Sequence, residues 1–441
     1  MKKFTVILLV ALLAMTALFA SGATEAKAKD VTLRLWTFLD ITSTTNGRAV
    51  VLKKAIDNFE STHPGVKVVV ETQQWTTLPS KVFAASEAGD CADLFMVNTA
   101  NRGEAIKRGV FEPLENMFYG SWTEAQKEDL NSAVLEAGFD GKYHYDIPVF
   151  FGGFGIMYRK DLFAEKGIDP DSIKTWADLV ATAQALTYTD SNGQKIWGYG
   201  IGYSLDVQDP HGALPNALFG QEGGMFTDEG MPNNWTGAIA KEALQMEVDL
   251  VSKYGVTPPS AASVTSEDVY TDFAAGKYAM ISAGTVRMPT VQSQCSFKPE
   301  DIGFMAYPSI DGKSESKCYA AGWHFGVWSG SKNKDLAGEF LEYICSAEID
   351  NLWVTEAQQV PLLKSTLKNS VSFFEIPTNE WVINAKNIID TKSYVQSIKY
   401  TVTGFNEDLQ NAFLLVNVQG KSVEDALKTV EKNFIDRNTQ R

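Results

Sequence analysis

The period of the hydrophobic pattern changes several times within the first hundred residues. Residues 31–36 alternate between apolar and polar side chains, which predicts a half-buried strand, and the apolar residues of 52–59 recur at helical spacing. The helix should end at the His-Pro-Gly sequence of 63–65, and the β-branched run 66–70 predicts a second strand. A strand, a helix and a strand in so short a span predict a βαβ unit with parallel strands.

Similar elements continue along the chain without a low-complexity linker or an internal repeat. A helix at 81–88, a strand at 94–97 and a helix at 102–108 extend the α/β arrangement. The later part of the chain predicts helices at 236–251, 266–275 and 337–344, a last helix from Ser422, and strands at 278–282, 302–307 and 324–328. The predicted fold class is therefore α/β.

The stretch from Asp146 to Leu186 carries the most distinctive pattern. Its Pro148 precedes three glycines set between aromatic residues, which indicates extended backbone that another part of the protein approaches closely. A strand at 156–158 and a short helix ended by Gly167 should follow. Thr175 then caps a longer helix, whose apolar stripe begins at the following tryptophan.

This stretch resembles the extracellular solute-binding proteins of ABC importers, the large family that includes maltose-binding protein. In that family a proline-containing crossover leads to Tyr-Asn-Lys-Asp-Leu-Phe, then to a glycine and to Thr-Trp-(Asp/Glu)-(Asp/Glu)-Leu. This chain departs from these motifs only at Arg159 and Ala177, two positions that we expect to face solvent. The order and spacing of the motifs carry the resemblance, rather than any one of them.

The resemblance implies a periplasmic-binding-protein-like fold of two lobes, each a mixed, mostly parallel sheet flanked by helices. The chain would pass between the lobes several times, so that each lobe is built from discontinuous segments. One lobe would hold 29–147 plus approximately 296–340, and the other 148–295 plus approximately 341–441.

The first 28 residues have the pattern of a secretion signal. Two N-terminal lysines precede an apolar run that ends at Ala20, which is too short for a membrane span. Residues 26–28 form an A-x-A cleavage site, and a site nearer Ala20 is the alternative. Ser21 stands where a lipoprotein has its lipidated cysteine. We therefore expect a soluble, exported protein, periplasmic or extracellular, that is not lipid-anchored.

The composition narrows the possible partners and cofactors. The formal net charge is -15 and no basic run occurs, so nucleic acid and anionic membrane surfaces are poor candidates. A polyanionic ligand is mildly disfavoured too, although one local arginine would override this. Export permits disulfides among Cys91, Cys295, Cys318 and Cys345, with Cys295–Cys318 the first pair to test, and the alternative is that all four are small buried apolar residues. No cysteine or histidine cluster predicts a metal site, and no cofactor is implied.

The ligand site should lie at the carboxyl ends of the strands, where open parallel sheets bind ligands. Flat aromatic rings cover the apolar faces of a pyranose, while carboxylate, amide and guanidinium groups bind neighbouring hydroxyls. The same loops line the cleft in maltose-binding-like proteins, so sheet polarity and the resemblance together suggest one set of ligand contacts. The candidates are Trp36, Asp40, Gln74, Trp75, Asn98, Phe151, Arg287, Trp323 and His324.

Several candidates have structural roles as alternatives. Asp40 and Asn98 would equally well cap the helices that follow them. His324 is either a ligand contact or a buried histidine with protein partners, and Arg287 would suit a carboxylate or phosphate as well as sugar hydroxyls. We expect Phe151 and the phenylalanine before it to divide between the cleft and the core.

The residues and the resemblance together predict a monomeric binding protein that captures a sugar or small oligosaccharide by closing its lobes and delivers it to a membrane-embedded ABC permease. No Gly-x-Ser-x-Gly, His-Glu-x-x-His or P-loop motif occurs, so we expect no enzyme. The alternatives are a binding protein for a sugar phosphate, a polyamine or another small solute, and a secreted glycan-acting enzyme, although no carboxylate pair stands out for glycoside hydrolysis.

Overall fold

The computed structural model describes residues 30–130, 132–207, 209–400 and 402–439. The expected signal segment, residues 1–28, lies outside these ranges, as do its cleavage and lipidation positions. Among the helices of the described ranges, none combines the length and the apolar character that crossing a bilayer requires.

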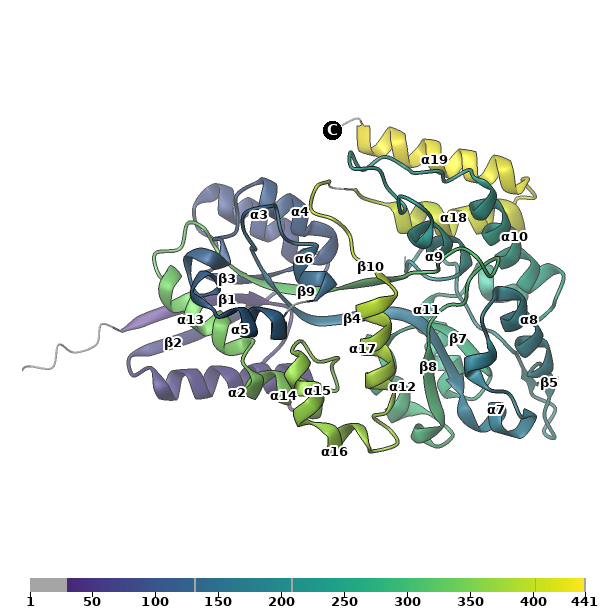
Figure 1. The fold of residues 1–441 in the computed structure, drawn as a ribbon, viewed down its shortest axis with the longest axis horizontal. Helices are drawn as coiled ribbons and strands as arrows, with labels where there is room; N and C mark the ends of the chain where they lie inside the picture. Colours follow the sequence, from purple (N-terminus) through teal and green to yellow (C-terminus); the bar gives the residue numbers. More distant parts are fainter. Residues whose placement is uncertain (1–29, 131, 208, 401, 440–441) are drawn as a thin grey trace, which may run out of the picture.

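Two long strands, β4 (Ile147–Arg159) and β9 (Cys318–Val327), join two halves of the molecule (Figure 1). The first part of β4 pairs with β9 in antiparallel register, and its last part pairs with two strands of the other half. The buried residues form two hydrophobic cores, and β4 contributes Ile147 to one and Ile156 to the other. The predicted two-lobe α/β class is therefore confirmed.

Another element lies against the middle of β4, as its glycines predict. A Cβ atom at Gly152 would lie 2.5 Å from the Thr285 hydroxyl and 2.9 Å from Val286 Cγ1, so no side chain fits there. The strand also has an irregular register between Val149 and Gly152, and Phe150 has a φ of 54°, which is unusual for an aromatic residue. β4 therefore changes course where it leaves one half and enters the other.

The first half is built on β1 (Val31–Thr37), β2 (Val66–Thr72) and β3 (Leu94–Asn98), and the sheet continues in the order β2-β1-β3-β9-β4. β1 is parallel to β2 and β3, as predicted, whereas β9 is antiparallel to β3. The helices of this half are α2 (Gly47–Thr62), α3 (Leu78–Ala88), α4 (Thr99–Lys107), α5 (Glu124–Leu130), α6 (Ala133–Glu136), α13 (Lys334–Ile344) and α14 (Ala347–Thr355).

The second half surrounds the end of β4, with β7 (Met280–Gly284) and β8 (Ile302–Met305) paired to it. Thr175 and Asp178 form the predicted capping box, and Trp176 is buried. The helices of this half are α7 (Lys160–Lys166), α8 (Trp176–Ala185), α9 (Ala213–Gly220), α10 (Ala238–Ser252), α11 (Ser266–Ala274), α12 (Met288–Gln294), α18 (Phe405–Asn417) and α19 (Val423–Thr439). Short strands are β5 (Tyr188–Thr189), β6 (Lys195–Ile196) and β10 (Ser393–Tyr394).

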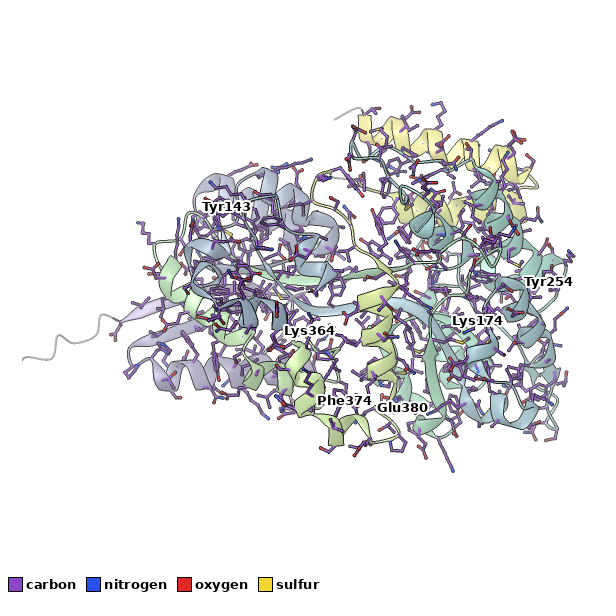
Figure 2. All side chains as sticks on the ribbon, viewed as in Figure 1. Tyr143, Lys174, Tyr254, Lys364, Phe374 and Glu380 are labelled. Carbon is purple, nitrogen blue, oxygen red and sulfur yellow. The ribbon has the colours of Figure 1, made fainter. Side chains whose placement is uncertain are left out.

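The last passage from the first half to the second runs through α15 (Lys364–Asn369), α16 (Val371–Phe374) and α17 (Trp381–Thr391). Lys364, Phe374 and Glu380 mark its course below the crossing strands in Figure 2. Glu380 forms an ion pair with Lys160 of α7 at 3.0 Å, which ties the passage to the second half.

Core membership differs from the expected segment boundaries. Phe304 lies in the core of the second half because β8 pairs with the last residues of β4. Phe340 lies in the core of the first half, where its ring meets that of Phe59 with centroids 4.9 Å apart. The first-half segment that was expected at approximately 296–340 therefore begins and ends later along the chain than expected. The second-half segment that was expected from approximately 341 on also begins later, because the chain is still in the first half there.

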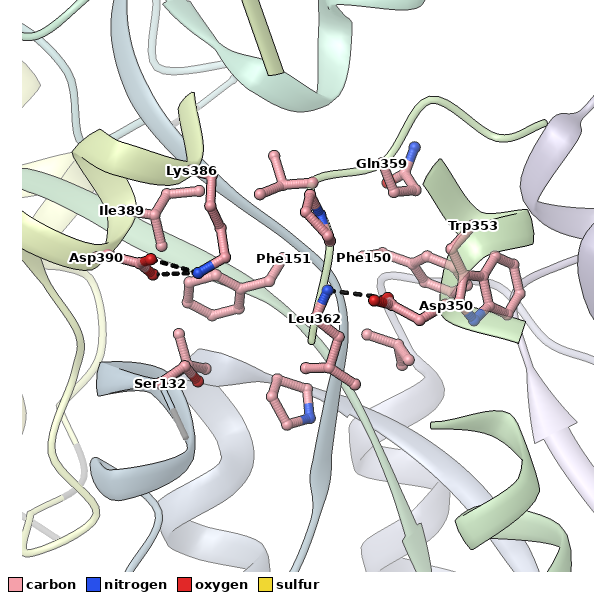
Figure 3. A pocket seen from close by; sticks show the side chains of 15 residues that line it. Ser132, Phe150, Phe151, Asp350, Trp353, Gln359, Leu362, Lys386, Ile389 and Asp390 are labelled. Carbon is pink, nitrogen blue, oxygen red and sulfur yellow. Dashed lines mark hydrogen bonds and ion pairs between the residues drawn. The ribbon is translucent and has the colours of Figure 1, made fainter. Parts of the chain in front are cut away.

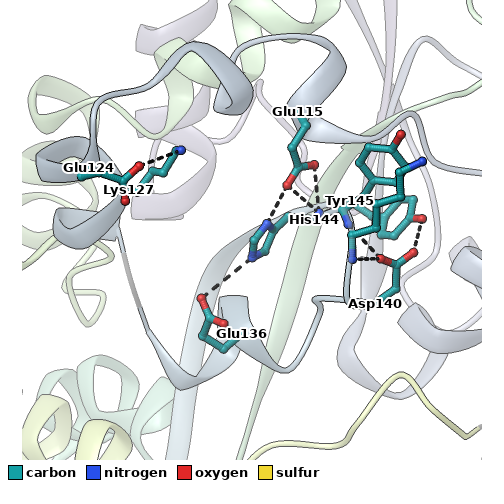
Figure 4. Close-up of polar contacts among 9 residues, drawn as sticks. Glu115, Glu124, Lys127, Glu136, Asp140, His144 and Tyr145 are labelled. Atoms are coloured by element: carbon teal, nitrogen blue, oxygen red, sulfur yellow. Dashed lines mark hydrogen bonds and ion pairs between the residues drawn. The ribbon is translucent and has the colours of Figure 1, made fainter.

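A polar cluster holds the chain just before β4 (Figure 4). Glu115 accepts hydrogen bonds from the backbone N–H of His144 at 2.9 Å and contacts its Nδ1 at 2.8 Å. Asp140 accepts from the backbone N–H groups of Lys142 and Tyr143, both at 2.8 Å, and from the Tyr145 hydroxyl at 2.5 Å. These bonds fix the direction in which the chain reaches the crossing strand.

All four cysteines are free thiols, so Cys295 and Cys318 are not bonded to one another in this structure. Cys91, Cys318 and Cys345 are buried, which matches the alternative of small apolar core residues. Within the described ranges, no three His, Cys, Asp or Glu side chains gather as a metal site would require.

Candidate ligand-binding site

A cavity of about 630 Å³ lies between the two halves. Its walls come from the beginning of α2 in the first half, from α12 and the residues before it in the second half, and from the loop that follows α14. Most lining residues are polar, and hydroxyl and amide groups predominate: Thr44, Thr45, Asn46, Thr290, Ser293 and Gln358. A cavity of this size and chemistry suits a small polyhydroxylated ligand.

Two aromatic rings, Phe38 and Phe150, lie against Arg48 beside the cavity, and a third, Trp323, extends this aromatic group. The Arg48 guanidinium carbon lies 5.6 Å from the ring centroid of Phe38 and 5.4 Å from that of Phe150. Trp323, a half-buried residue of β9, lies beside Phe38 with centroids 4.6 Å apart. Both distances to Arg48 are within the range of cation–π attraction, so the rings hold this side chain in place.

The charges around the cavity are paired, with one exception. Glu356 accepts a hydrogen bond from Lys54 Nζ at 2.7 Å, and Arg287 forms an ion pair with Glu267. Arg48 lines the cavity and has no such partner among the residues that the structure describes. Burial lowers the pKa of Arg48, and the positive charge of Arg287 lowers it further.

Backbone strain is concentrated near this cavity. Phe150, Asn234 and Gln358 are the non-glycine residues with positive φ in the described part of the chain. Gln358, with a φ of 51°, lines the cavity, and Phe150 lies under Arg48. Strained residues of this kind cluster at binding sites, where the surrounding structure must hold them.

Three of the predicted contacts, Trp36, Asn98 and Asp40, already have protein partners. Trp36 is buried, and its Nε1 donates to Glu71 Oε2 at 2.9 Å. Asn98 caps α4, where its side chain accepts from the backbone N–H of Asn101 at 3.0 Å. Asp40 is exposed and accepts from the backbone N–H of Thr42 at 2.9 Å, so it shapes a turn and does not cap α2.

Gln74 and Trp75 lie in the exposed loop after β2. The Trp75 side chain is 60% exposed, which is high for an indole. An exposed ring at the carboxyl end of a parallel strand is available to a ligand, but neither residue lines the cavity described above.

Arg287 and Trp323 each lie next to a residue at the cavity. Arg287 ends a short 3-10 turn, η5 (Thr285–Arg287), and Val286 beside it lines the cavity from the second half. Trp323 belongs to the aromatic group around Arg48 and approaches from the first half. Neither residue lines the cavity itself: Arg287 follows the lining residue Val286, and Trp323 is linked to the lining residue Arg48 through Phe38.

His324 is fully buried at the crossing strands, with both ring nitrogens engaged by protein. Its Nδ1 lies 2.6 Å from Asp146 Oδ1, and its Nε2 lies 3.0 Å from Thr99 Oγ1. Burial lowers the pKa of His324. Burial also disfavours the Asp146 carboxylate, but His324 and Arg102 outweigh this, and the pKa of Asp146 is lowered. In this conformation His324 joins α4 to the crossing strands and is closed to a ligand.

Phe151 lines a second, much smaller cavity of about 40 Å³ (Figure 3). Lys386 and Asp390 of α17 border the same space and form an ion pair, with Nζ 2.6 Å from Oδ1. Asp350 accepts from the backbone N–H of Leu362 at 2.9 Å, and burial raises the pKa of Asp350. This cavity holds a few water molecules at most, so Phe151 has no access to a sugar there.

The strand-end rule missed Phe38, Arg48 and the hydroxyl groups near them. Phe38 directly follows β1, so the rule could have included it. Arg48 lies in the first turn of α2, beyond the loop that follows the strand. The polar run of Ser and Thr that precedes Asn46 was the available signal, since such a run next to a helix start often contacts ligands.

Similarity to known proteins agrees with this architecture. The family model of bacterial extracellular solute-binding proteins matches residues 43–350, so the chain belongs to this family. The mannitol-binding protein of Pseudomonas aeruginosa is 23% identical over 321 residues, which cover 70% of this chain and 69% of that protein. The arabinooligosaccharide-binding protein of Bacillus subtilis is 24% identical over 374 residues, covering 80% of this chain and 79% of that protein.

Solved structures show the same fold. The GacH receptor of Streptomyces glaucescens, determined unliganded and in complex with acarbose, superposes with a TM-score of 0.71. The two sequences are 17% identical, and the match covers 92% of this chain and 98% of the receptor. The family and these relatives are binding proteins.

Proposed function

We propose that this protein captures a sugar or small oligosaccharide between its two halves and delivers it to a membrane-embedded ABC permease. The observation that carries the proposal is the cavity whose walls belong to both halves. A ligand there contacts α2 on one side and α12 on the other. The names of the relatives, which bind mannitol and arabinooligosaccharide, support a polyhydroxylated ligand.

The proposed contacts follow from the lining. Thr44, Thr45, Thr290 and Ser293 present hydroxyl groups that both donate and accept hydrogen bonds, which suits the rim of a sugar. The aromatic group at Trp323 offers flat apolar surface for a sugar face. Trp75 and Gln74 remain candidates for the outer part of a longer ligand.

Capture proceeds by closure of the two halves about the strands that join them. A ligand that touches both halves binds the closed form more tightly than the open form, so it shifts the population towards closure. β4 and β9 are the natural hinge because the chain changes from one core to the other along them. The permease would recognise the closed form, and no bond-breaking step is required.

The proposed location follows from the family and from the leader. The first 28 residues direct export and are removed, and Ser21 excludes lipidation at that position. The protein then works as a soluble monomer outside the cytoplasmic membrane.

A thermal-shift screen of the mature protein tests the proposal. At 100 times its dissociation constant, a ligand should add about 2.7 kcal/mol to the free energy of unfolding. We expect a sugar or oligosaccharide to give the largest shift among sugars, polyols, amino acids, polyamines and phosphates. A large shift with amino acids or polyamines and none with carbohydrates would contradict it. Turnover of a chromogenic glycoside would instead support the enzyme alternative.

A further inference from the structure

We propose that the ligand carries an anionic substituent, a carboxylate or a phosphate, which binds Arg48 in the cavity between the two halves. This inference rests on the proposed function and narrows the substrate class to acidic sugars or sugar phosphates. It makes Arg48 the residue that determines specificity.

Arg48 stands apart from the other arginines of the described chain. The other six each have a carboxylate within ion-pair distance, and they are Arg34, Arg102, Arg108, Arg159, Arg287 and Arg437. Arg48 has none among the described residues, and its guanidinium lies against the rings of Phe38 and Phe150. A guanidinium presents five donors in a planar fork, and aromatic rings leave most of them unused.

The surroundings of Arg48 also disfavour its charge. The side chain is partly buried, and the neighbouring charge that lowers its pKa is that of another cation, Arg287. An anionic group placed in the cavity would pair with Arg48 and offset both the burial and the repulsion. Arg287 already has Glu267, so it would contribute longer-range attraction more than a second ion pair.

The rest of the cavity indicates that the anion is one part of a larger ligand. A volume of about 630 Å³ far exceeds that of a simple anion. The one carboxylate in the lining, Glu356, is neutralised by Lys54, so it does not repel a ligand anion. Hydroxyl and amide side chains surround the remaining space, which suits a ring with several hydroxyl groups.

Isothermal titration calorimetry with matched probes tests this inference. The probes are D-galacturonate, D-glucuronate and glucose 6-phosphate, their neutral parents D-galactose and D-glucose, and acetate and inorganic phosphate alone. We expect at least one charged sugar to bind tenfold or more tightly than its parent. Arg48→Gln should weaken the binding of that charged sugar on the order of 10- to 100-fold and leave the affinity for its neutral parent nearly unchanged. Arg108→Gln, an exposed arginine outside the cavity, should behave as the wild type.

The outcomes separate this inference from the proposed function. A preference for the uronates assigns a carboxylate, and a preference for glucose 6-phosphate assigns a phosphate. Neutral sugars that bind as well as charged ones, with no change in Arg48→Gln, overturn the anionic class and leave sugar capture intact. Acetate or phosphate binding as tightly as a charged sugar overturns it as well. Polyamines or amino acids binding in place of every sugar overturn both proposals.

A second variant keeps the inference testable if Arg48→Gln does not fold. Arg48→Lys keeps the positive charge and much of the contact with the rings, but it loses the planar fork. We expect an intermediate loss of affinity for the charged sugar, with the melting temperature of the empty protein unchanged. Equal affinity for charged and neutral sugars in the wild type and in Arg48→Lys would mean that Arg48 only packs against Phe38 and Phe150.

Discussion

Adjacent residues of β4 border two very different cavities. Phe150 and Phe151 both line the smaller one with Lys386, and the ring of Phe150 also lies under Arg48, which lines the larger one. Lys386 has its own carboxylate, Asp390, one helical turn away, whereas Arg48 has none within the described ranges. The smaller space is about 40 Å³, against about 630 Å³ for the larger.

The difference separates a structural cavity from a binding site. A cation that is paired within the protein stabilises the fold and needs no ligand to balance its charge. A cation that is partly buried and unpaired leaves hydrogen-bonding capacity that only another molecule supplies. The two cavities near Phe150 and Phe151 therefore differ in the pairing of the cation beside each one.

The largest effect should come from a buried carboxyl that also has no cation within ion-pair distance in the described part of the chain. Glu247 of α10 is buried in the second half, and burial raises its pKa to about 8. Between the ordinary pKa of 4.5, which applies to the unfolded chain, and about 8, the Glu247 carboxyl is protonated in the folded protein but ionised in the unfolded chain. The free energy of unfolding therefore falls as pH rises through that range and stays low above it. Glu247→Gln should stabilise the protein by roughly 2–4 kcal/mol at pH 9.

Chemical denaturation at pH 4 and pH 9 checks this difference. Both proteins have a neutral side chain at pH 4, so the gain should vanish there. Glu242→Gln, an exposed position on the same helix, serves as the control and should show no gain at either pH. An equal gain for Glu247→Gln at both pH values would refute the assigned cause.

The next effect tests the ion pair between Lys386 and Asp390 beside the smaller cavity. Asp390→Asn would leave Lys386 largely buried without a counter-ion, as Arg48 is now. We expect a loss of about 2 kcal/mol in the free energy of unfolding, and no change in ligand affinity. Adding Lys386→Met to the same chain should recover most of the loss. A variant with unchanged stability but weaker ligand binding would move the binding site to the smaller cavity.

A smaller effect should separate two half-buried tryptophans of the first half. Trp323→Ala removes a ring beside the cavity, and we expect affinity for the sugar to fall about tenfold, since ring contacts are worth about 1.5 kcal/mol. Trp328 instead donates from Nε1 to Ser86 at 3.0 Å, away from the Phe38 contact that Trp323 makes. Trp328→Ala should therefore cost stability but keep the affinity, as calorimetry of both variants would show. Equal affinity losses in the two variants would place Trp323 among structural residues.

The fold could be predicted largely because its signals are local. The alternation of β1 and the capping box of Thr175 and Asp178 lie within a few residues of each other, and both were confirmed. The segment boundaries could not be read in this way. They depend on pairing between β8 and the end of β4, and on packing of Phe340 against Phe59, contacts between residues far apart in the sequence.

The site could be predicted only in part, because the type of a residue does not reveal whether its side chain binds another protein group or a ligand. Trp36 and Asn98 satisfy the strand-end rule, yet Glu71 and Asn101 already bind them. Arg287 and Trp323 satisfy the same rule and lie near the cavity without lining it, Arg287 next to Val286 and Trp323 against Phe38. Arg48 is distinguished by the absence of a carboxylate in the described surroundings, a property that no pattern along the chain displays.

A crystal structure with the carbohydrate that gives the largest thermal shift tests the central claim most directly. The account predicts the ligand in the space between α2 and α12, with a charged or polar oxygen within hydrogen-bonding distance of the Arg48 guanidinium. A ligand bound elsewhere, with Arg48 still resting on Phe38 and Phe150 and making no contact to it, would contradict the account.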